Sequence, residues 1–254
     1  MQKLKNLTIL FILTTLFVVL GSPSPDVLAS PDAFAPDLGS AATFVALAHE
    51  TVTNTGSGVF VGDVGVYPGT EVTGFPPGTL RHGTIYRGGA VAAQAQIDAN
   101  NAYNDLKGEK CNVDLTGKDL GGKTLTPGVY CFDTSAQLTG ALVLDALGNP
   151  YAVWVFQTGS TLKTASNSTV AVINNGQAVK VFWQVGSSAT LGTGTRFIGN
   201  ILAKASISMV TGASLIGRAL ALTGAVTMNT NGTPAPIANT PLYEFYYLPI
   251  MRLP

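Results

Sequence analysis

Two stretches decide the expected fold: Thr190-Leu-Gly-Thr-Gly-Thr-Arg-Phe-Ile-Gly199 and Ser208-Met-Val-Thr-Gly-Ala-Ser-Leu-Ile-Gly217 align with an offset of 18 residues. A third, looser copy runs through residues 226–233. A period near 18 residues with three short strands suits one turn of a β-helix, in which stacked turns bury a core that no single turn could bury. A β-sandwich is the alternative. Glycine and small polar residues at matched positions favour the β-helix.

From Ser135 onward, short β-type runs alternate with Gly, Asn and Ser. They are rich in β-branched and aromatic residues, which are enriched in strands. The clearest runs are Tyr151–Phe156, Thr169–Ile173, Val179–Trp183 and Phe197–Leu202. A series of such strands predicts a mainly β protein.

One segment, at about residues 89–107, breaks this pattern because it is rich in alanine, the best helix former. Its apolar residues recur at three- and four-residue steps, which predicts a helix with one apolar stripe. Gly108 is placed to end the helix. The stripe consists of Ala92, Ala95, Ala99, Ala102, Tyr103 and Leu106. We expect it to pack along the wall of the β-helix.

Pro-Gly turns dominate the segment at about residues 56–84, which we interpret as a cap over one end of the β-helix. A cap would cover an open strand edge, which is otherwise a site of association. The apolar and aromatic run at residues 242–254 is expected to pack on the core or to finish the last coil. Contact with a membrane or cell surface is its alternative role.

The N-terminus has the order of a secretory signal peptide: Lys3 and Lys5, an apolar run from Leu7 to Leu20, then small residues. We predict cleavage between Ala29 and Ser30, which leaves residues 30–254 as a single secreted domain, extracellular or periplasmic. A retained anchor is the alternative. The apolar run is shorter than the ~20 residues of a spanning helix and no later stretch qualifies, so no membrane span is expected.

Charge is scarce throughout the chain. Charged residues make up 11% of it, against ~25% in ordinary globular proteins. Loss of residues 1–29 takes away two basic residues and one acidic residue, so 14 of each become 12 and 13. No basic patch could collect phosphates, so nucleic acid is not an expected partner. A surface of low charge suits a neutral partner, and we expect a monomer.

The chain has two cysteines, Cys111 and Cys131. In an exported protein, an even number at short spacing predicts a disulfide. A metal site would need more ligands, and the only histidines are His49 and His82. No Cys-x-x-Cys redox motif occurs. We therefore expect no metal and no cofactor.

Several motifs in order resemble the microbial ice-binding (antifreeze) proteins with a discontinuous β-helix. The resemblance runs from about Leu38 to Asn231. The motifs are Gly62-Asp-Val-Gly-Val-Tyr-Pro-Gly69, Val72-Thr-Gly-Phe-Pro-Pro-Gly78, Leu115-Thr-Gly-Lys-Asp-Leu-Gly-Gly122, Leu125-Thr-Pro-Gly-Val-Tyr-Cys131, Phe182–Gly194, Gly199-Asn-Ile-Leu-Ala203 and Gly217-Arg-Ala-Leu-Ala221.

This resemblance implies a right-handed triangular β-helix with the helix beside it. It also implies that the first coil, near residues 40–62, stacks against the last coils. Family members adsorb to ice through one flat face, and some carry Thr-(Ala/Gly)-x-(Thr/Asn) on that face. We therefore expect ice as the partner, with inhibition of ice growth and of recrystallisation.

Six stretches match that motif fully or in part. Thr158-Gly-Ser-Thr161 and Thr164-Ala-Ser-Asn167 match it fully, and the other four match it in part. The candidate ice-binding residues are Thr55, Thr158, Thr161, Thr164, Asn167, Thr193, Thr211, Ser214, Thr230 and Thr233. One Thr per coil would form a ladder with the ~4.8 Å strand repeat, close to an oxygen spacing in ice. Since Thr favours strands and turns anywhere, the group is a firmer prediction than any member.

The composition leaves two other functions as alternatives. β-Helices also host polysaccharide lyases and hydrolases, which need paired carboxylates or an acidic cluster with a cation. The acids here are scattered and read as turn or solvated residues, so no enzyme is expected. They are Asp63, Asp98, Asp105, Glu109, Asp114, Asp119, Asp133 and Asp145. The remaining alternative is a cell-surface adhesin or matrix-binding β-solenoid.

Overall fold

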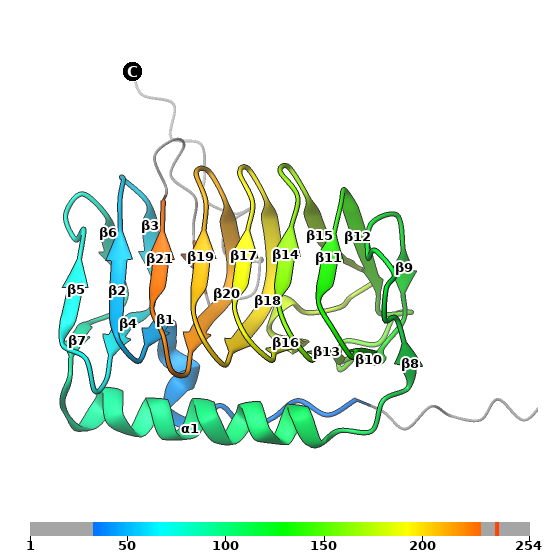
Figure 1. The fold of residues 1–254 in the computed structure, drawn as a ribbon, viewed down its shortest axis with the longest axis horizontal. Coiled ribbons are helices and arrows are strands. Elements are labelled where there is room, and N and C mark those ends of the chain that lie inside the picture. Colours follow the sequence, from blue (N-terminus) through cyan, green and yellow to red (C-terminus); the bar gives the residue numbers. More distant parts are fainter. Residues whose placement is uncertain (1–32, 230–236, 239–254) are drawn as a thin grey trace, which may run out of the picture.

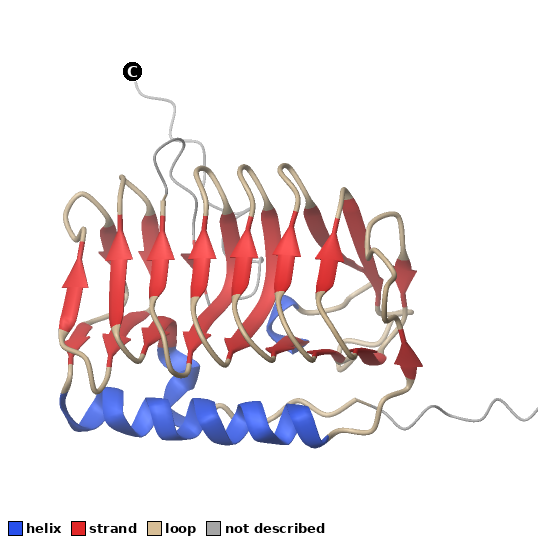
Figure 2. Ribbon diagram, in the orientation of Figure 1, coloured by secondary structure: helices blue, strands red, loops and turns tan. Residues whose placement is uncertain are grey.

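The structure is a computed structural model that describes residues 33–229 and 237–238. The predicted signal peptide, Thr230, Thr233 and the aromatic run 242–254 lie outside the described residues. Within them, short parallel strands stack side by side, and one long helix runs along the stack (Figures 1 and 2). The expectation of a mainly β protein with one packed helix is confirmed.

The sheet that faces the reader in Figure 1 has seven parallel strands in the described chain, and we call it the front sheet. Its neighbours in order are β11 (Ala136–Leu138), β14 (Leu162–Thr164), β17 (Ala189–Leu191), β19 (Ile207–Met209), β21 (Val226–Met228), β2 (Thr51–Asn54) and β5 (Glu71–Thr73). Each strand is only three or four residues long because a corner of the coil follows it at once.

The remaining strands form two further stacks. Beside the helix lie β8 (Val113–Asp114), β10 (Gly128–Phe132), β13 (Trp154–Thr158), β16 (Val181–Val185), β18 (Arg196–Ala203), β20 (Ser214–Ala221), β1 (Phe44–Ala48), β4 (Asp63–Val66) and β7 (Ile85–Arg87). The rear stack contains β9 (Thr124–Leu125), β12 (Ala141–Asp145), β15 (Thr169–Ile173), the first halves of β18 and β20, β22 (Ile237–Ala238), β3 (Val59–Val61) and β6 (Thr79–Arg81). Strands β18 and β20 are long enough to join the two stacks into one sheet.

The predicted 18-residue repeat is the register of neighbouring coils. Thr190 pairs with Ser208, and Gly199 pairs with Gly217. These two glycines mark the bend within β18 and β20, where the coils approach closely. A Cβ on Gly217 would lie 2.1 Å from the carbonyl oxygen of Gly199, and its φ is +144°. Only glycine fits this bend without displacing backbone.

Chain order and spatial order differ, as the family resemblance implied. Strand β1 pairs with both β20 and β4, and β2 pairs with both β21 and β5. The first coil of the chain therefore lies between its last repeat and the coil that follows it in sequence. This discontinuity is confirmed.

Helix α1 spans Gly89–Gly108, within one residue of the prediction, and all six stripe residues are buried. Alanine lets the helix approach the sheet closely, since its side chain ends at Cβ. All stripe residues except Ala92 form a second core with apolar residues of the helix-side stack, among them Val155, Phe182 and Leu220. The main core lies between the three stacks and includes the stacked rings of Phe156 and Trp183, with centroids 3.9 Å apart.

The segment expected to form a cap does not form a separate subdomain. Its residues supply β3, β4, β5 and β6, so they continue the stacks as terminal coils.

Two predicted strands start later than expected. A turn in which Asn149 Oδ1 accepts the Tyr151 N–H delays β13 to Trp154. Residues 178–180 form the 3-10 turn η2 (Ala178–Lys180), which delays β16 to Val181.

The predicted disulfide between Cys111 and Cys131 is present, with Cα atoms 5.9 Å apart. It connects the segment after α1 to β10. A further short turn, η1 (Gly39–Thr43), precedes β1. No helix in the described part of the chain is long and apolar enough to cross a membrane.

Candidate functional site

Five of the seven strands of the front sheet present one outward side chain at their centre, while β2 and β5 present their first and third residues. The flanking residues of each central position point inward and are buried, as the buried–accessible–buried patterns of β14, β17, β19 and β21 show. Backbone pairing places these central residues and the third residues of β2 and β5 in one line, which we call the central row. In spatial order it reads Gln137, Lys163, Thr190, Ser208, Thr227, Thr53 and Thr73.

Five consecutive members of this row carry hydroxyl groups, and we call Thr190, Ser208, Thr227, Thr53 and Thr73 the hydroxyl ladder. Neighbouring rungs repeat at the ~4.8 Å spacing of parallel strands. Threonine is stiff at χ1, so its hydroxyl and methyl groups keep their positions. The Thr73 and Thr53 hydroxyl oxygens lie 3.5 Å apart. The ladder is therefore a straight, rigid and uncharged line.

A second row lies two residues earlier in each coil, on the helix side of the sheet in Figure 1, and we call it the lower row. Hydrogen bonds such as Leu162 N–H to Ser188 O extend the strand register to it. The Thr161 and Ser135 hydroxyl oxygens are 2.8 Å apart. The row consists of Ser135, Thr161, Ser188, Ser206, Ala225, Thr51 and Glu71. It adds a parallel line roughly 6.6 Å from the hydroxyl ladder, two residues along the strand. Five of its seven members are Ser or Thr, whereas Ala225 is apolar and Glu71, on the terminal strand β5, is charged.

Loops at the opposite edge continue this surface. Thr193 and Thr211 occupy equivalent positions, since the Gly194 N–H donates to Thr211 O and the Asn167 N–H donates to Thr193 O. Asn167 and Gly194 both have positive φ, +59° and +67°, which tightens each turn. Thr193 and Asn167 are exposed, and Thr211 is half-buried. These residues form an upper corner beside the front sheet.

A buried hydroxyl network lies beneath this corner. The Thr164 and Thr195 hydroxyl oxygens are 2.8 Å apart, and Thr164 Oγ1 accepts the Gly192 N–H at 2.9 Å. Thr195 also donates to the Ala165 carbonyl. Because buried threonine hydroxyl groups form hydrogen bonds with the backbone of these loops, the loops are held against the coils that carry them.

Comparison with known proteins identifies this architecture. The sequence model of the family described as Ice-binding-like matches residues 46–233. An ice-binding protein of Nostoc sp. (strain HG1) is 59% identical over 195 residues, covering 76% of this chain and 72% of that protein. The chain belongs to the Ice-binding-like family. An ice-binding protein of Flavobacterium frigoris (strain PS1) is 32% identical and covers 79% of this chain and 76% of its own length.

Solved structures of the Ice-binding-like family have the same fold. The crystal structure of an ice-binding protein from the Antarctic ascomycete Antarctomyces psychrotrophicus has a TM-score of 0.77 and 39% identity, with 82% of this chain and 99% of that chain covered. An ice-binding protein from an Antarctic biological consortium has a TM-score of 0.77 and 43% identity, with 80% and 91% covered. The relatives are described as ice-binding proteins rather than enzymes.

The structure separates the predicted site residues. Thr161 lies in the lower row, and Thr55 is exposed at the end of β2. Thr193, Thr211 and Asn167 lie at the upper corner. Thr158 and Thr164 are each 2% exposed and face inward, so the two full motif matches begin with a residue that cannot reach a flat partner.

Ser214 lies at the start of β20, in the rear stack, and its hydroxyl faces the Thr195 carbonyl at 3.5 Å. It is therefore on a different side from the front sheet.

The hydroxyl ladder itself was missed. Its signal was present, since Thr190 and Ser208 open the two aligned repeats. The deciding pattern is a small hydroxyl residue between two buried residues, repeated at the coil period. The Thr-(Ala/Gly)-x-(Thr/Asn) motif selects mainly corner and loop residues instead.

The acidic residues behave as turn residues. Asp114, Asp119 and Asp145 each accept a backbone N–H two residues ahead. Burial raises the pKa of Asp119, but hydrogen bonds from Gly121 and Thr139 outweigh it and lower that pKa. Burial raises the pKa of Glu109, which accepts the Phe34 N–H. No group of three or more metal-ligating side chains occurs in the described residues.

Proposed function

We propose that the protein binds ice through the front sheet, with the hydroxyl ladder at the centre of the contact and the upper corner at its edge. The observation that carries this proposal is the register of the ladder: five hydroxyl residues from five neighbouring strands lie in one row. Family membership supports ice as the partner.

The chemistry follows from the spacing and the rigidity. The hydroxyl ladder with its ~4.8 Å repeat, beside a mainly Ser and Thr row roughly 6.6 Å away, forms a two-dimensional array of small side chains on the sheet. Hydroxyl groups hold water, and the fixed methyl groups between them limit where that water sits. Since the array is already ordered, little entropy is lost when it docks on a crystal. Charged side chains would disturb this layer, because they hold their own hydration shells.

Adsorption of this face to a crystal would block further growth there. We therefore infer freezing-point depression and inhibition of recrystallisation as the measurable activities, and a monomer as the active species. We further infer that the coil is right-handed and triangular, because parallel crossovers take that hand in nearly all proteins and three stacks surround the core. Secretion after cleavage between Ala29 and Ser30 is part of the same proposal, since ice outside the cell is then within reach.

The test is thermal hysteresis and recrystallisation inhibition by residues 30–254, beside the variant Thr227→Tyr. A Tyr ring at the middle of the hydroxyl ladder would hold the face off a flat crystal. The matched control is Thr124→Tyr, which places the same bulk on an exposed position of β9 in the rear stack. We expect Thr227→Tyr to lose most of the hysteresis and Thr124→Tyr to keep it, with both melting temperatures unchanged.

Two results would contradict this expectation. If Thr227→Tyr is as active as the wild type, ice binding stands and the proposed face is wrong. If the folded wild type leaves ice growth untouched, ice binding fails, and the adhesin or matrix-binding hypothesis comes first.

A further inference from the structure

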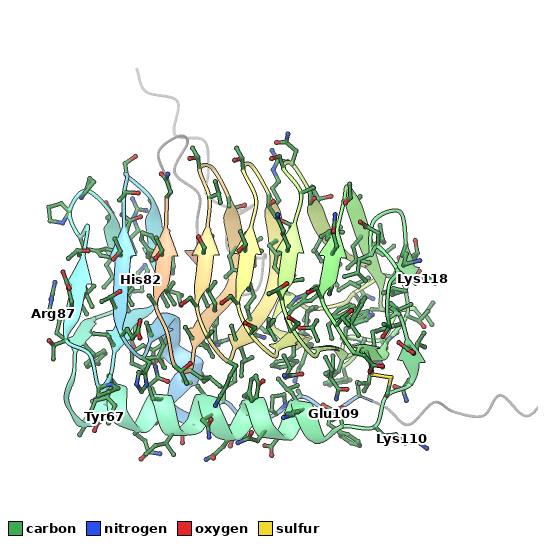
Figure 3. All side chains as sticks on the ribbon, in the orientation of Figure 1. Tyr67, His82, Arg87, Glu109, Lys110 and Lys118 are labelled. Atoms are coloured by element: carbon green, nitrogen blue, oxygen red, sulfur yellow. A yellow bond between two sulfur atoms is a disulfide. The ribbon has the colours of Figure 1, made fainter. Side chains whose placement is uncertain are left out.

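Lys163 interrupts the central row between Gln137 and Thr190. It lies at the centre of β14, is exposed, and pairs with Thr190 in the backbone register. It is the one charged residue among the seven members of the central row. Among the basic residues that Figure 3 labels, Arg87 and Lys118 lie at opposite ends of the molecule. Lys163, by contrast, is an internal member of the row.

The lower row has small polar residues on the coil that carries Lys163 and on the next coil away from the ladder. Thr161 lies two residues before Lys163 on the same coil, and its hydroxyl bonds to that of Ser135 on the next coil. Thr139, on that coil, is also exposed. No carboxylate in the described residues forms an ion pair with Lys163. On the ladder side the next five members of the central row are uncharged, whereas on the other side Gln137 is followed in the register by the exposed carboxylate of Asp119.

An ammonium group on a flexible four-carbon stem is strongly hydrated, and it holds water in its own shell. Pressing that shell against a crystal would require either desolvation of the charge or water that does not match the ice lattice. Both costs fall on the coil that carries Lys163.

We propose that Lys163 sets the boundary of the ice-binding face, which confines ice contact to the coils of β17, β19, β21, β2 and β5. This inference rests on the proposed function. Lys163 is thus a residue that limits binding rather than one that contributes to it.

The variant Lys163→Thr tests this, because it would lengthen the hydroxyl ladder from five rungs to six. If binding scales with the contact area, thermal hysteresis at equal concentration rises by about a fifth or more. Threonine favours strands, so β14 is not weakened. Lys163→Gln, which removes the charge but keeps an unbranched polar side chain longer than threonine, is a second variant that should raise hysteresis by less. Lys163→Arg keeps the charge and should give no gain.

The control is Lys110→Thr, the same replacement at an exposed lysine between α1 and the disulfide (Figure 3). It removes one positive charge from the molecule but none from the front sheet, so no gain is expected.

The outcomes separate the two levels of the proposal. If Lys163→Thr is folded and no more active than the wild type, while Thr227→Tyr is inactive, the boundary inference is overturned and the ice face stands. An equal gain from Lys110→Thr would also overturn it, because net charge would then be the cause. If Thr227→Tyr is fully active, the proposed face itself is wrong.

Discussion

Threonine has two opposite roles in this protein, and they depend only on which way the side chain points. Thr190 and Thr227 face outward from the front sheet, one on each side of Ser208 in the ladder. Thr164, the last residue of β14, points inward like Leu162 two residues before it and is buried. Its hydroxyl group supports the corner loop instead of meeting a partner. The same residue type therefore forms the candidate surface and stiffens it from below.

At this scale we predict that Thr164→Val destabilises the protein. Valine keeps the shape but removes an oxygen that bonds to Thr195 and to the Gly192 N–H. Leaving buried polar groups without partners costs about 1–3 kcal/mol of unfolding free energy. The matched control is Thr161→Val in the lower row, where surface changes stay within about 0.5 kcal/mol. Urea denaturation measures both, and equal losses would contradict the assigned role of Thr164.

At the scale of elements, one buried cation connects the N-terminal segment to the last full coil. Arg218 of β20 is 7% exposed, and burial lowers its pKa to about 10. Its Nε donates to the Ala42 carbonyl at 2.9 Å and its Nη1 to Asn200 Oδ1 at 2.7 Å. Ala42 belongs to η1, which leads into β1. Arg218 thus holds in place the segment that closes the discontinuity between coils.

We predict that Arg218→Met lowers the unfolding free energy by about 2 kcal/mol, because hydrogen bonds to a charged donor are lost and Asn200 keeps an unsatisfied buried oxygen. Hydrogen exchange should rise in η1 and β1 before it rises in β10 or β13. Arg196→Met is the control, since Arg196 lies on the neighbouring strand β18 and is exposed. An unchanged or higher stability would show that the cost of burying the guanidinium exceeds the value of its hydrogen bonds.

At the scale of the whole molecule, the two ends of the stack of coils are connected to α1 in different ways. At one end, the terminal coils of β5, β6 and β7 lead directly into α1 (Figure 1). At the other end, α1 leads through Cys111 to the first strands of the long run of coils. The disulfide to Cys131 ties that return to β10 (Figure 3). The hydroxyl ladder lies nearer the end without the disulfide.

We predict that replacing Cys111 and Cys131 together by Ser lowers the unfolding free energy by about 3 kcal/mol, the chain-entropy value for a loop of about 20 residues. Thermal hysteresis measured near 0 °C should stay unchanged, because no rung of the ladder contacts the bridge. A melting temperature equal to that of the wild type would mean that the bridge does not constrain the unfolded chain. A folded variant without hysteresis would mean that the bridge supports the face.

By itself, the sequence determined the period of the coils, the helix with its buried alanine stripe, and the disulfide. Each depends on residues close together in the chain: an 18-residue repeat, apolar positions at helical steps, and two cysteines. The family resemblance added the discontinuous order of the coils. These features could be predicted because local spacing reflects the local geometry of a strand or helix.

Only the tertiary structure decided which threonines face outward. Side chains alternate along a strand, but each corner of a coil resets that alternation, and the three-residue strands of the front sheet are too short to show it. The core sets the direction: in β14, Leu162 and Thr164 point inward, so Lys163 points out. The ladder also joins Thr53 to Thr227, which are far apart in the chain and adjacent only after β2 inserts beside β21. A local motif carries no information on either point, since both depend on what the coils pack against.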